Sequence, residues 1–328
     1  MRESASLPIG VAALLFEGAR HHRRLEGEMV EHLEQGGFAE IILPVVDYLA
    51  PYEQMLSQAS RSELYRFVDR DGEMLLMRAD FTPMLARLLA PRLPSLELPL
   101  RLFYRGEVFR YQEERAGRQR EFYQLGAEVL GPPGPEAEAE ALRTFVELLS
   151  TGERQSLVVV FGFAGALDGL ILDAAPEAEG GGVGLVDAIG RRERRHAKKA
   201  GQALLEVVEE GMPRDLSVLG QHAAERLERM ISLRDELAER FPDVELRIDL
   251  AEFADQVVTP KLKGALGARA YYDGLVFRAF AGAAAEPVGG GGRYDSLFAQ
   301  FGAKITATGF SISLDRLLGR ARLEGENS

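Results

Sequence analysis

The sequence of 328 residues contains no cysteine. Its absence excludes disulfide bonds, thiolate zinc sites and catalysis by a cysteine nucleophile, and it is compatible with the cytoplasmic location that we expect. Basic residues are also in the minority, with 39 Lys+Arg against 51 Asp+Glu and a formal net charge of −12. Broad, sequence-independent binding to nucleic acid needs a basic surface that releases counterions, so this charge balance argues against that class of function.

Long hydrophobic runs are missing too. The N-terminal region has an unbroken apolar stretch only over residues 11–16, with no basic leader before it, so we expect no signal peptide. No window approaches the run of about 18 apolar residues that crosses a bilayer, so we expect no membrane span. Hydrophobic residues make up 46% of the chain and charged residues 27%, which is typical of globular domains and allows one large domain or two.

Apolar periodicity and turn signals predict the strands and helices. Residues 39–46 predict one strand, and Pro44 within it indicates an edge or an interface, because proline cannot donate to a ladder. Two hairpins are expected next, with strands over residues 64–69, 73–78, 100–113 and 121–131. Later strands are expected over residues 157–163, 244–250, 270–279 and 307–313, and helices over residues 11–36, from Thr82 onward with Pro83 at the first position, over 135–150 and over 314–323. These pairs predict an α+β fold in which helices flank a mixed, mostly antiparallel sheet.

Residues 164–240 differ from the rest, because their pattern is helical and charged. We expect them to form a helical insertion within one domain that spans residues 1–328. The most basic stretch of this segment covers residues 191–199. We interpret that stretch as a solvated helix face in preference to a nucleic-acid site.

Two segments combine a predicted strand with a proline or with charged residues. Residues 37–46 pass from a helix end into the strand with Pro44. Residues 104–131 form a strand pair around a charged loop, and Arg110 stands near the end of its first strand. A planar guanidinium suits bidentate contact with phosphate, although Arg110 could instead pair with a carboxylate of the sheet.

A third segment contains the run Gly-Gly-Gly-Gly-Arg-Tyr-Asp at residues 289–295, followed by a strand and helix over residues 307–317. The glycines either let a ligand approach the backbone closely or form a flexible turn. In this order the three segments resemble the three signature motifs of class II aminoacyl-tRNA synthetases, and in detail those of the histidyl enzyme. The resemblance covers nearly the whole chain. It implies a class II synthetase-like fold, a dimer interface at the first motif, and ATP-binding roles for Arg110 and Arg316.

The sequence departs from the synthetase pattern at positions that the chemistry needs. Gly267 stands where the histidyl enzymes carry an arginine at the reacting carboxylate and α-phosphate, and Ala270 replaces an aspartate. A cation at that place is a large electrostatic contribution to catalysis. Arg269 lies two positions after Gly267, on the same face of a strand, and could compensate in part. Gln112 also replaces an acidic residue that helps to hold ATP, so we expect no catalytic residues and only a vestigial ATP site.

The amino-acid pocket is better preserved. The resemblance implies that Asp80 grips an α-ammonium group, that Thr82 keeps a hydroxyl, and that Gln124 and Glu128 lie near the substrate amine and imidazole. A buried glutamate could hold an imidazole nitrogen by a charge-assisted hydrogen bond. For each residue taken alone, a hydrogen bond within the core is the safer interpretation. As a set they predict a histidine-binding site made of Asp80, Thr82, Gln124, Glu128, Tyr271 and Tyr272, with no metal and no cofactor.

The chain ends at Ser328, shortly after Arg316, so we expect no anticodon-binding domain. A synthetase-like domain without this module and without the catalytic arginine resembles the regulatory subunits of ATP phosphoribosyltransferase. The resemblance implies a non-catalytic protein that activates the short catalytic subunit and mediates histidine feedback in histidine biosynthesis. It also implies a dimer within a hetero-octamer, histidine as the allosteric effector, and binding to neither tRNA nor membrane. The alternatives are a truncated synthetase-like enzyme that makes an aminoacyl-adenylate with Arg110, Arg316 and Arg269, and a scaffold that binds no ligand.

Overall fold

Two sheets organise the protein in the computed structural model, which describes residues 7–53, 55, 58–112, 119–151, 156–175, 181–266, 271–282 and 286–319. The main sheet has the strand order β1-β5-β6-β11-β10-β9-β7-β8, and the small sheet has the order β2-β4-β3. The strands are β1 (Ala39–Glu40), β2 (Val46–Tyr48), β3 (Arg66–Val68), β4 (Met74–Met77), β5 (Leu100–Phe109), β6 (Glu121–Leu130), β7 (Leu157–Phe163), β8 (Val244–Ile248), β9 (Leu275–Ala281), β10 (Gly289–Arg293) and β11 (Ala307–Ser313).

The centre of the main sheet is antiparallel. Neighbours from β5 to β7 run antiparallel, and the pairs β1–β5 and β7–β8 at the two edges are parallel. This confirms the expected α+β fold with a mixed, mostly antiparallel sheet. The glycine run at 289–292 is neither a turn nor a loop but most of β10, which lies between β9 and β11. A Cβ atom on Gly291 would overlap the backbone of β11, so the close approach that glycine permits here is between strands.

The expectation of one strand over residues 39–46 was wrong. β1 pairs with β5 in the main sheet, whereas β2 pairs with β4 in the small sheet. Between them the chain turns around Arg78, whose Nη1 donates to the carbonyls of Leu43 (2.8 Å) and Pro44 (3.3 Å). The proline therefore lies where the chain leaves one sheet for the other. The expected hairpin over residues 64–78 is confirmed as β3 and β4.

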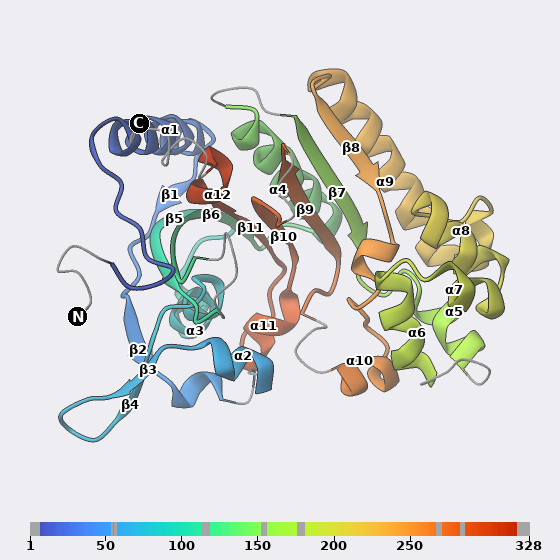
Figure 1. Ribbon diagram of the computed structural model, residues 1–328, viewed down its shortest axis with the longest axis horizontal. Helices are drawn as coiled ribbons and strands as arrows, with labels where there is room; N and C mark the ends of the chain where they lie inside the picture. Colours follow the sequence, from blue (N-terminus) through green and yellow to red (C-terminus); the bar gives the residue numbers. More distant parts are fainter. Residues whose placement is uncertain are drawn as a thin grey trace.

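Helices cover both faces of the main sheet, as Figure 1 shows. On one face α1 and α4 bury apolar side chains against Leu125, Phe277 and Phe310 of the sheet. On the other face α3 and α11 form a second core around Phe81 and Tyr104. The α-helices are α1 (Phe16–Gln35), α2 (Gln58–Glu63), α3 (Thr82–Leu89), α4 (Gly134–Leu149), α5 (Asp168–Ala174), α6 (Gly181–Gly190), α7 (Arg194–Ala200), α8 (Gln202–Glu210), α9 (Gln221–Arg240), α10 (Pro260–Leu266), α11 (Asp295–Gln300) and α12 (Leu314–Leu318). In the described part of the chain, none of them is long and apolar enough to cross a membrane.

The segment 164–240 is helical as expected and contains α5 to α9. Figure 1 shows these helices at the β8 edge of the main sheet, at the opposite end of the molecule from the small sheet. Their buried side chains, such as Ile189 and Leu227, belong to the same core cluster as those of β7. The basic stretch 191–199 is mostly exposed, and two of its arginines pair with carboxylates, Arg192 with Asp249 and Arg194 with Glu209.

Candidate functional site

Glu128 is the most deeply buried carboxyl group among the candidate site residues, with 1% of its surface exposed. It lies on β6, and three hydroxyl groups donate to it: Thr82 (3.0 Å) and Tyr104 (3.1 Å) to Oε1, and Tyr294 to Oε2. Burial, with a smaller contribution from the charge of Asp80, outweighs the three hydroxyl donors and raises the pKa of Glu128 to about 8. The group is therefore mostly protonated at neutral pH and can both donate and accept a hydrogen bond.

Glycines make room for this carboxyl group on the sheet. Gly309 lies directly opposite Glu128 across the β6–β11 pair, and a Cβ atom there would overlap the carboxylate. A Cβ atom on Gly126 would lie 2.6 Å from the ring of Tyr104. A Cβ atom on Gly292 would lie 2.7 Å from the ring of Tyr272. The side chains of Glu128, Tyr104 and Tyr272 thus pack directly against the backbone of these glycines.

Asp80 stands at the opening of the site, with 45% of its side chain exposed. Its Oδ1 accepts the backbone N–H of Thr82 (3.1 Å), and its Oδ2 lies 3.6 Å from Nη2 of Arg110. Nε of Arg110 donates to the carbonyl of Ala79 (2.9 Å). The carboxylate nearest to Arg110 is therefore that of Asp80, which lies outside the strands, and not a carboxylate of the sheet. A cavity of about 270 Å³ opens beside this pair, and Tyr271 also contributes to its wall. Gln124, Glu128 and Tyr272 do not line this cavity.

Gln124 lies on the same face of β6 as Glu128, four residues away, and is 6% exposed. Its Oε1 has no hydrogen-bond partner in the described part of the chain. The residue opposite on β11 is Ser313, whose buried Oγ is likewise without a partner among the described residues. A buried polar atom without a partner is costly, so these two positions carry unsatisfied hydrogen-bonding capacity within the described residues.

The tyrosine pair completes the wall near Glu128. The rings of Tyr271 and Tyr272 meet edge to face with centroids 5.0 Å apart, and Tyr271 lies 5.8 Å from the ring of Tyr294. Oε1 of Gln256 accepts both backbone N–H groups of the pair, at 3.2 and 3.3 Å. The pair is therefore fixed through its backbone by a residue that follows β8.

Arg316 and Arg110 lie against one aromatic ring. Their guanidinium carbons are 5.6 and 5.4 Å from the centroid of Phe122. Nη1 of Arg316 also donates to the carbonyl of Pro287 (3.0 Å), and its Nη2 lies 3.4 Å from Glu286. Two cations close to an aromatic ring suit a nucleotide or another anionic ligand with a flat group.

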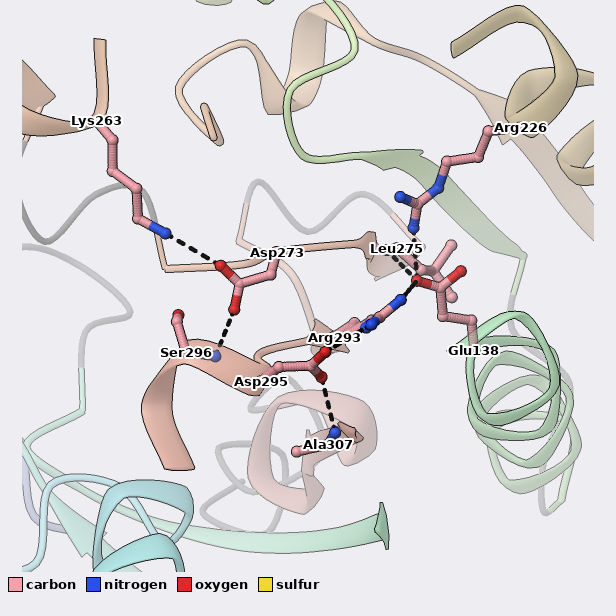
Figure 2. A network of polar contacts seen from close by, with 9 residues as sticks. All are labelled: Glu138, Arg226, Lys263, Asp273, Leu275, Arg293, Asp295, Ser296 and Ala307. Atoms are coloured by element: carbon pink, nitrogen blue, oxygen red, sulfur yellow. Dashed lines mark hydrogen bonds and ion pairs between the residues drawn. The ribbon is translucent and has the colours of Figure 1, made fainter. Parts of the chain in front are cut away.

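A network of polar contacts links α9 of the helical segment with α4 and with the residues on either side of Tyr294 (Figure 2). Arg226 of α9 donates to Glu138 of α4 (2.5 Å), which also accepts the N–H of Leu275 (3.1 Å) and lies 3.7 Å from Arg293. Arg293 in turn donates to Asp295 (2.6 Å), so two charged residues flank Tyr294 in the sequence. Lys263 of α10, Asp273 and the N–H of Ser296 form a second branch, with distances of 3.1 and 2.7 Å. These contacts connect α9 and α10 with residues that lie close to Tyr294 in the sequence.

The structure brings Asp80, Thr82, Glu128 and Tyr271 together around α3 and the middle of the sheet, and it places Gln124 farther along the same strand face. Sequence reasoning missed Tyr104 and Tyr294 as partners of Glu128. Both lie within the motif segments, Tyr104 on β5 and Tyr294 directly after β10, and the signal that could have found them is a hydroxyl group in each motif. Gly267, Arg269 and Ala270 lie outside the described residues. Within the described chain no group of three or more His, Asp or Glu side chains is arranged to hold a metal ion.

Comparison with known proteins agrees with this fold. The histidyl-tRNA synthetase family model matches residues 10–317. The ATP phosphoribosyltransferase regulatory subunit of Desulforamulus reducens is 32% identical over 96% of this chain and 79% of its own length. The chain belongs to the histidyl-tRNA synthetase family, among the ATP phosphoribosyltransferase regulatory subunits.

Other members of the family show its two kinds of function. The histidine–tRNA ligase of Pyrobaculum islandicum is 31% identical over 92% of this chain and 72% of the ligase. A solved ATP phosphoribosyltransferase regulatory subunit/histidyl-tRNA synthetase of Bacillus halodurans superposes with a TM-score of 0.77 and 25% identity, covering 96% of this chain and 83% of that one. A chain of the ATP phosphoribosyl transferase (HisG:HisZ) complex of Thermotoga maritima shares the fold, with a TM-score of 0.63, 20% identity, and coverage of 90% of this chain and 97% of that one.

Proposed function

We propose that this chain is a non-catalytic regulatory subunit that activates a short ATP phosphoribosyltransferase catalytic subunit and makes it sensitive to histidine. The observation that carries the proposal is an asymmetry between two halves of one site. The carboxyl, hydroxyl and amide groups around Glu128 and Asp80 are kept, while glycine and alanine occupy positions 267 and 270, where synthetases carry arginine and aspartate. A subunit that senses histidine must bind the amino acid without converting it to an adenylate.

The retained groups suit the functional groups of histidine. The exposed carboxylate of Asp80 is placed for an ammonium group at the mouth of the cavity. Glu128, which burial keeps mostly protonated, can exchange a hydrogen bond with a neutral imidazole nitrogen. The free Oε1 of Gln124 accepts a further N–H donor. We therefore assign histidine binding to Asp80 and Tyr271 on the cavity wall together with Thr82, Gln124, Glu128 and Tyr272 deeper in the protein.

Feedback requires that histidine bind one state of the complex more tightly than another. The network of Figure 2 offers a route between the pocket and α9, because Glu138 accepts from Arg226 and lies beside Arg293. If Tyr294 moves when histidine binds, its neighbours Arg293 and Asp295 move with it and change the contacts with Glu138. The helical segment 164–240 is thus the part of the chain that we expect to respond to the effector.

Self-association as a dimer is supported by an exposed apolar surface at the first motif. Ile42, next to β1, is 91% exposed, and Tyr48 on β2 is 52% exposed. Further exposed apolar side chains lie on the small sheet or directly before it, at Val45, Val46, Phe67, Val68 and Met74. A concentration of this kind is typical of an interface. We assign this surface to the dimer and place the dimer within a hetero-octamer with the catalytic subunit.

The competing function is an enzyme that forms histidyl-adenylate, and the position of Arg110 and Arg316 against Phe122 favours it. Histidine-dependent ATP–pyrophosphate exchange separates the two. We expect the purified chain to bind histidine in calorimetry, to co-purify with a short catalytic subunit, and to show no exchange above background. Robust exchange by the chain alone would refute the regulatory function. Absence of heat with histidine, for both the chain and its complex, would leave only a scaffold.

A further inference from the structure

A second cavity of about 280 Å³ lies between the N-terminal segment, α1, the β5–β6 hairpin and α12. Its wall includes His22 and Arg23 of α1, Glu107 of β5, Tyr123 of β6 and Asp315 of α12. Glu107 lies directly opposite Tyr123 on the face of the hairpin that is turned away from Glu128. The cavity is therefore separate from the histidine pocket, with the sheet between them.

His22 is buried, with 4% of its surface exposed, yet no hydrogen bond joins either ring nitrogen to a residue in the described part of the chain. Its ring meets that of Tyr123 edge to face at 4.9 Å and 88°. Desolvation lowers the pKa of His22, so the imidazole is neutral at physiological pH and offers one donor and one acceptor. Because the imidazole lies on the cavity wall and bonds to no described residue, a ligand in the cavity can supply its hydrogen-bond partner.

The cavity is also acidic. Arg23 donates to Glu26 (2.5 Å), and Arg105 donates to Glu26 (2.9 Å) and to Glu40 (2.8 Å), so these two cations and two carboxylates neutralise each other. Glu107 and Glu121 line the cavity and form no ion pair with any residue whose structure is described. They are diagonal neighbours on adjacent strands, at about 7–8 Å between backbones, where two uncompensated negative charges repel.

The shape and the chemistry of the wall define the cation that would fit. No described group of three His, Asp or Glu side chains is arranged for a metal ion, and the volume is large enough for a group of amino-acid size. Tyr123 adds aromatic surface, which attracts organic cations. A guanidinium or primary ammonium group has the charge for the glutamates, and its N–H groups match the imidazole acceptor.

We propose that this cavity is a binding site for a guanidinium or primary ammonium group, held by Glu107, Glu121 and His22. The group can belong to a free small molecule or to an arginine or lysine side chain of the catalytic subunit, and the second source rests on the proposed function. The chemistry of recognition is the same for both.

The first arm of the test uses the full-length chain and a matched pair of probes. n-Butylguanidinium carries the charge, and n-butylurea is its neutral isostere. Calorimetry should show binding of the first and not of the second, and NMR should show a shift of the His22 ring resonance. The double variant Glu107→Gln/Glu121→Gln should bind the cation at least tenfold more weakly. The control variant Glu34→Gln/Glu97→Gln has the same charge change at exposed positions away from the cavity, and it should bind as the original chain does.

The second arm measures association with the short catalytic subunit. A tenfold loss in Glu107→Gln/Glu121→Gln, together with competition by n-butylguanidinium, would assign the site to a partner side chain. Binding of the probe with unchanged association would assign it to a free small molecule. Equal probe affinity in both double variants would overturn the proposal, and so would no probe binding combined with unchanged association. Histidine binding, measured on the same samples, should be unaffected, so failure here is distinguishable from failure of the histidine site.

Discussion

The protonation of Glu128 gives the account a quantitative test. The folded protein holds this carboxyl group with a pKa of about 8, against an ordinary value of 4.5. A raised pKa means that the folded state keeps a proton that the unfolded state releases. The stabilising effect of this proton is therefore complete below pH 4.5, decreases as the pH rises, and is lost above pH 8.

Glu128→Gln removes the titration and keeps a side chain of the same size. Each pH unit between the two pKa values is worth about 1.4 kcal/mol, so the full difference is about 5 kcal/mol. Between pH 5 and pH 7 the variant should gain about 3 kcal/mol of stability relative to the original chain. The sign is positive because glutamine pays no cost for ionisation as the pH rises.

Urea denaturation followed by circular dichroism at pH 5, 6, 7 and 8 measures this difference directly. The exposed variant Glu34→Gln serves as the control, and its stability should follow that of the original chain at every pH. The reasoning fails if the gap between Glu128→Gln and the original chain stays constant within about 1 kcal/mol over this range. In that case Glu128 is ionised in the folded protein and its three hydroxyl donors hold a charge.

Three further outcomes follow from single contacts. Gly309→Ala should destabilise the protein by about 1–3 kcal/mol and abolish histidine binding, since the new methyl group overlaps the carboxylate of Glu128; thermal melts and calorimetry check this. Arg226→Met, at the far end of the network in Figure 2, should change histidine affinity by about threefold to thirtyfold without touching the ligand, whereas Arg234→Met on the same helix should not; equal affinities would show that the network carries no coupling. Ile42→Asp should convert the dimer to a monomer in light scattering, because this side chain is 91% exposed on the apolar surface; an unchanged mass would place the interface elsewhere.

The fold could be predicted largely from local sequence signals. The hairpin β3–β4 and the helix that begins at Thr82 with Pro83 were correct, because turn residues and proline constrain the backbone locally. The strand at Pro44 and the glycine run at residues 289–292 were predicted wrongly, because contacts between distant residues determine their structure. What places them is the contact of Arg78 with two distant carbonyls and the close packing of β10 against its neighbours. Neither contact can be predicted from the pattern of neighbouring residues in the sequence.

The candidate site was predictable in composition but not in arrangement. Motif resemblance selected Glu128 and Thr82, and the two are hydrogen-bonded. Tyr294 was overlooked, because its hydroxyl meets Glu128 only after β10 and β6 are brought to the same part of the sheet. The second cavity was overlooked as well, since His22 and Glu107 are distant in sequence and meet only where α1 crosses the hairpin.

The central claim is that this chain regulates a partner through histidine and performs no chemistry of its own. It is tested most directly by the rate at which a short ATP phosphoribosyltransferase catalytic subunit joins ATP to phosphoribosyl pyrophosphate. We predict that addition of this chain raises the rate and that histidine then lowers it, with Asp80→Ala shifting the inhibition to higher histidine concentrations. A catalytic rate that is the same with and without this chain, at every histidine concentration, would contradict the account.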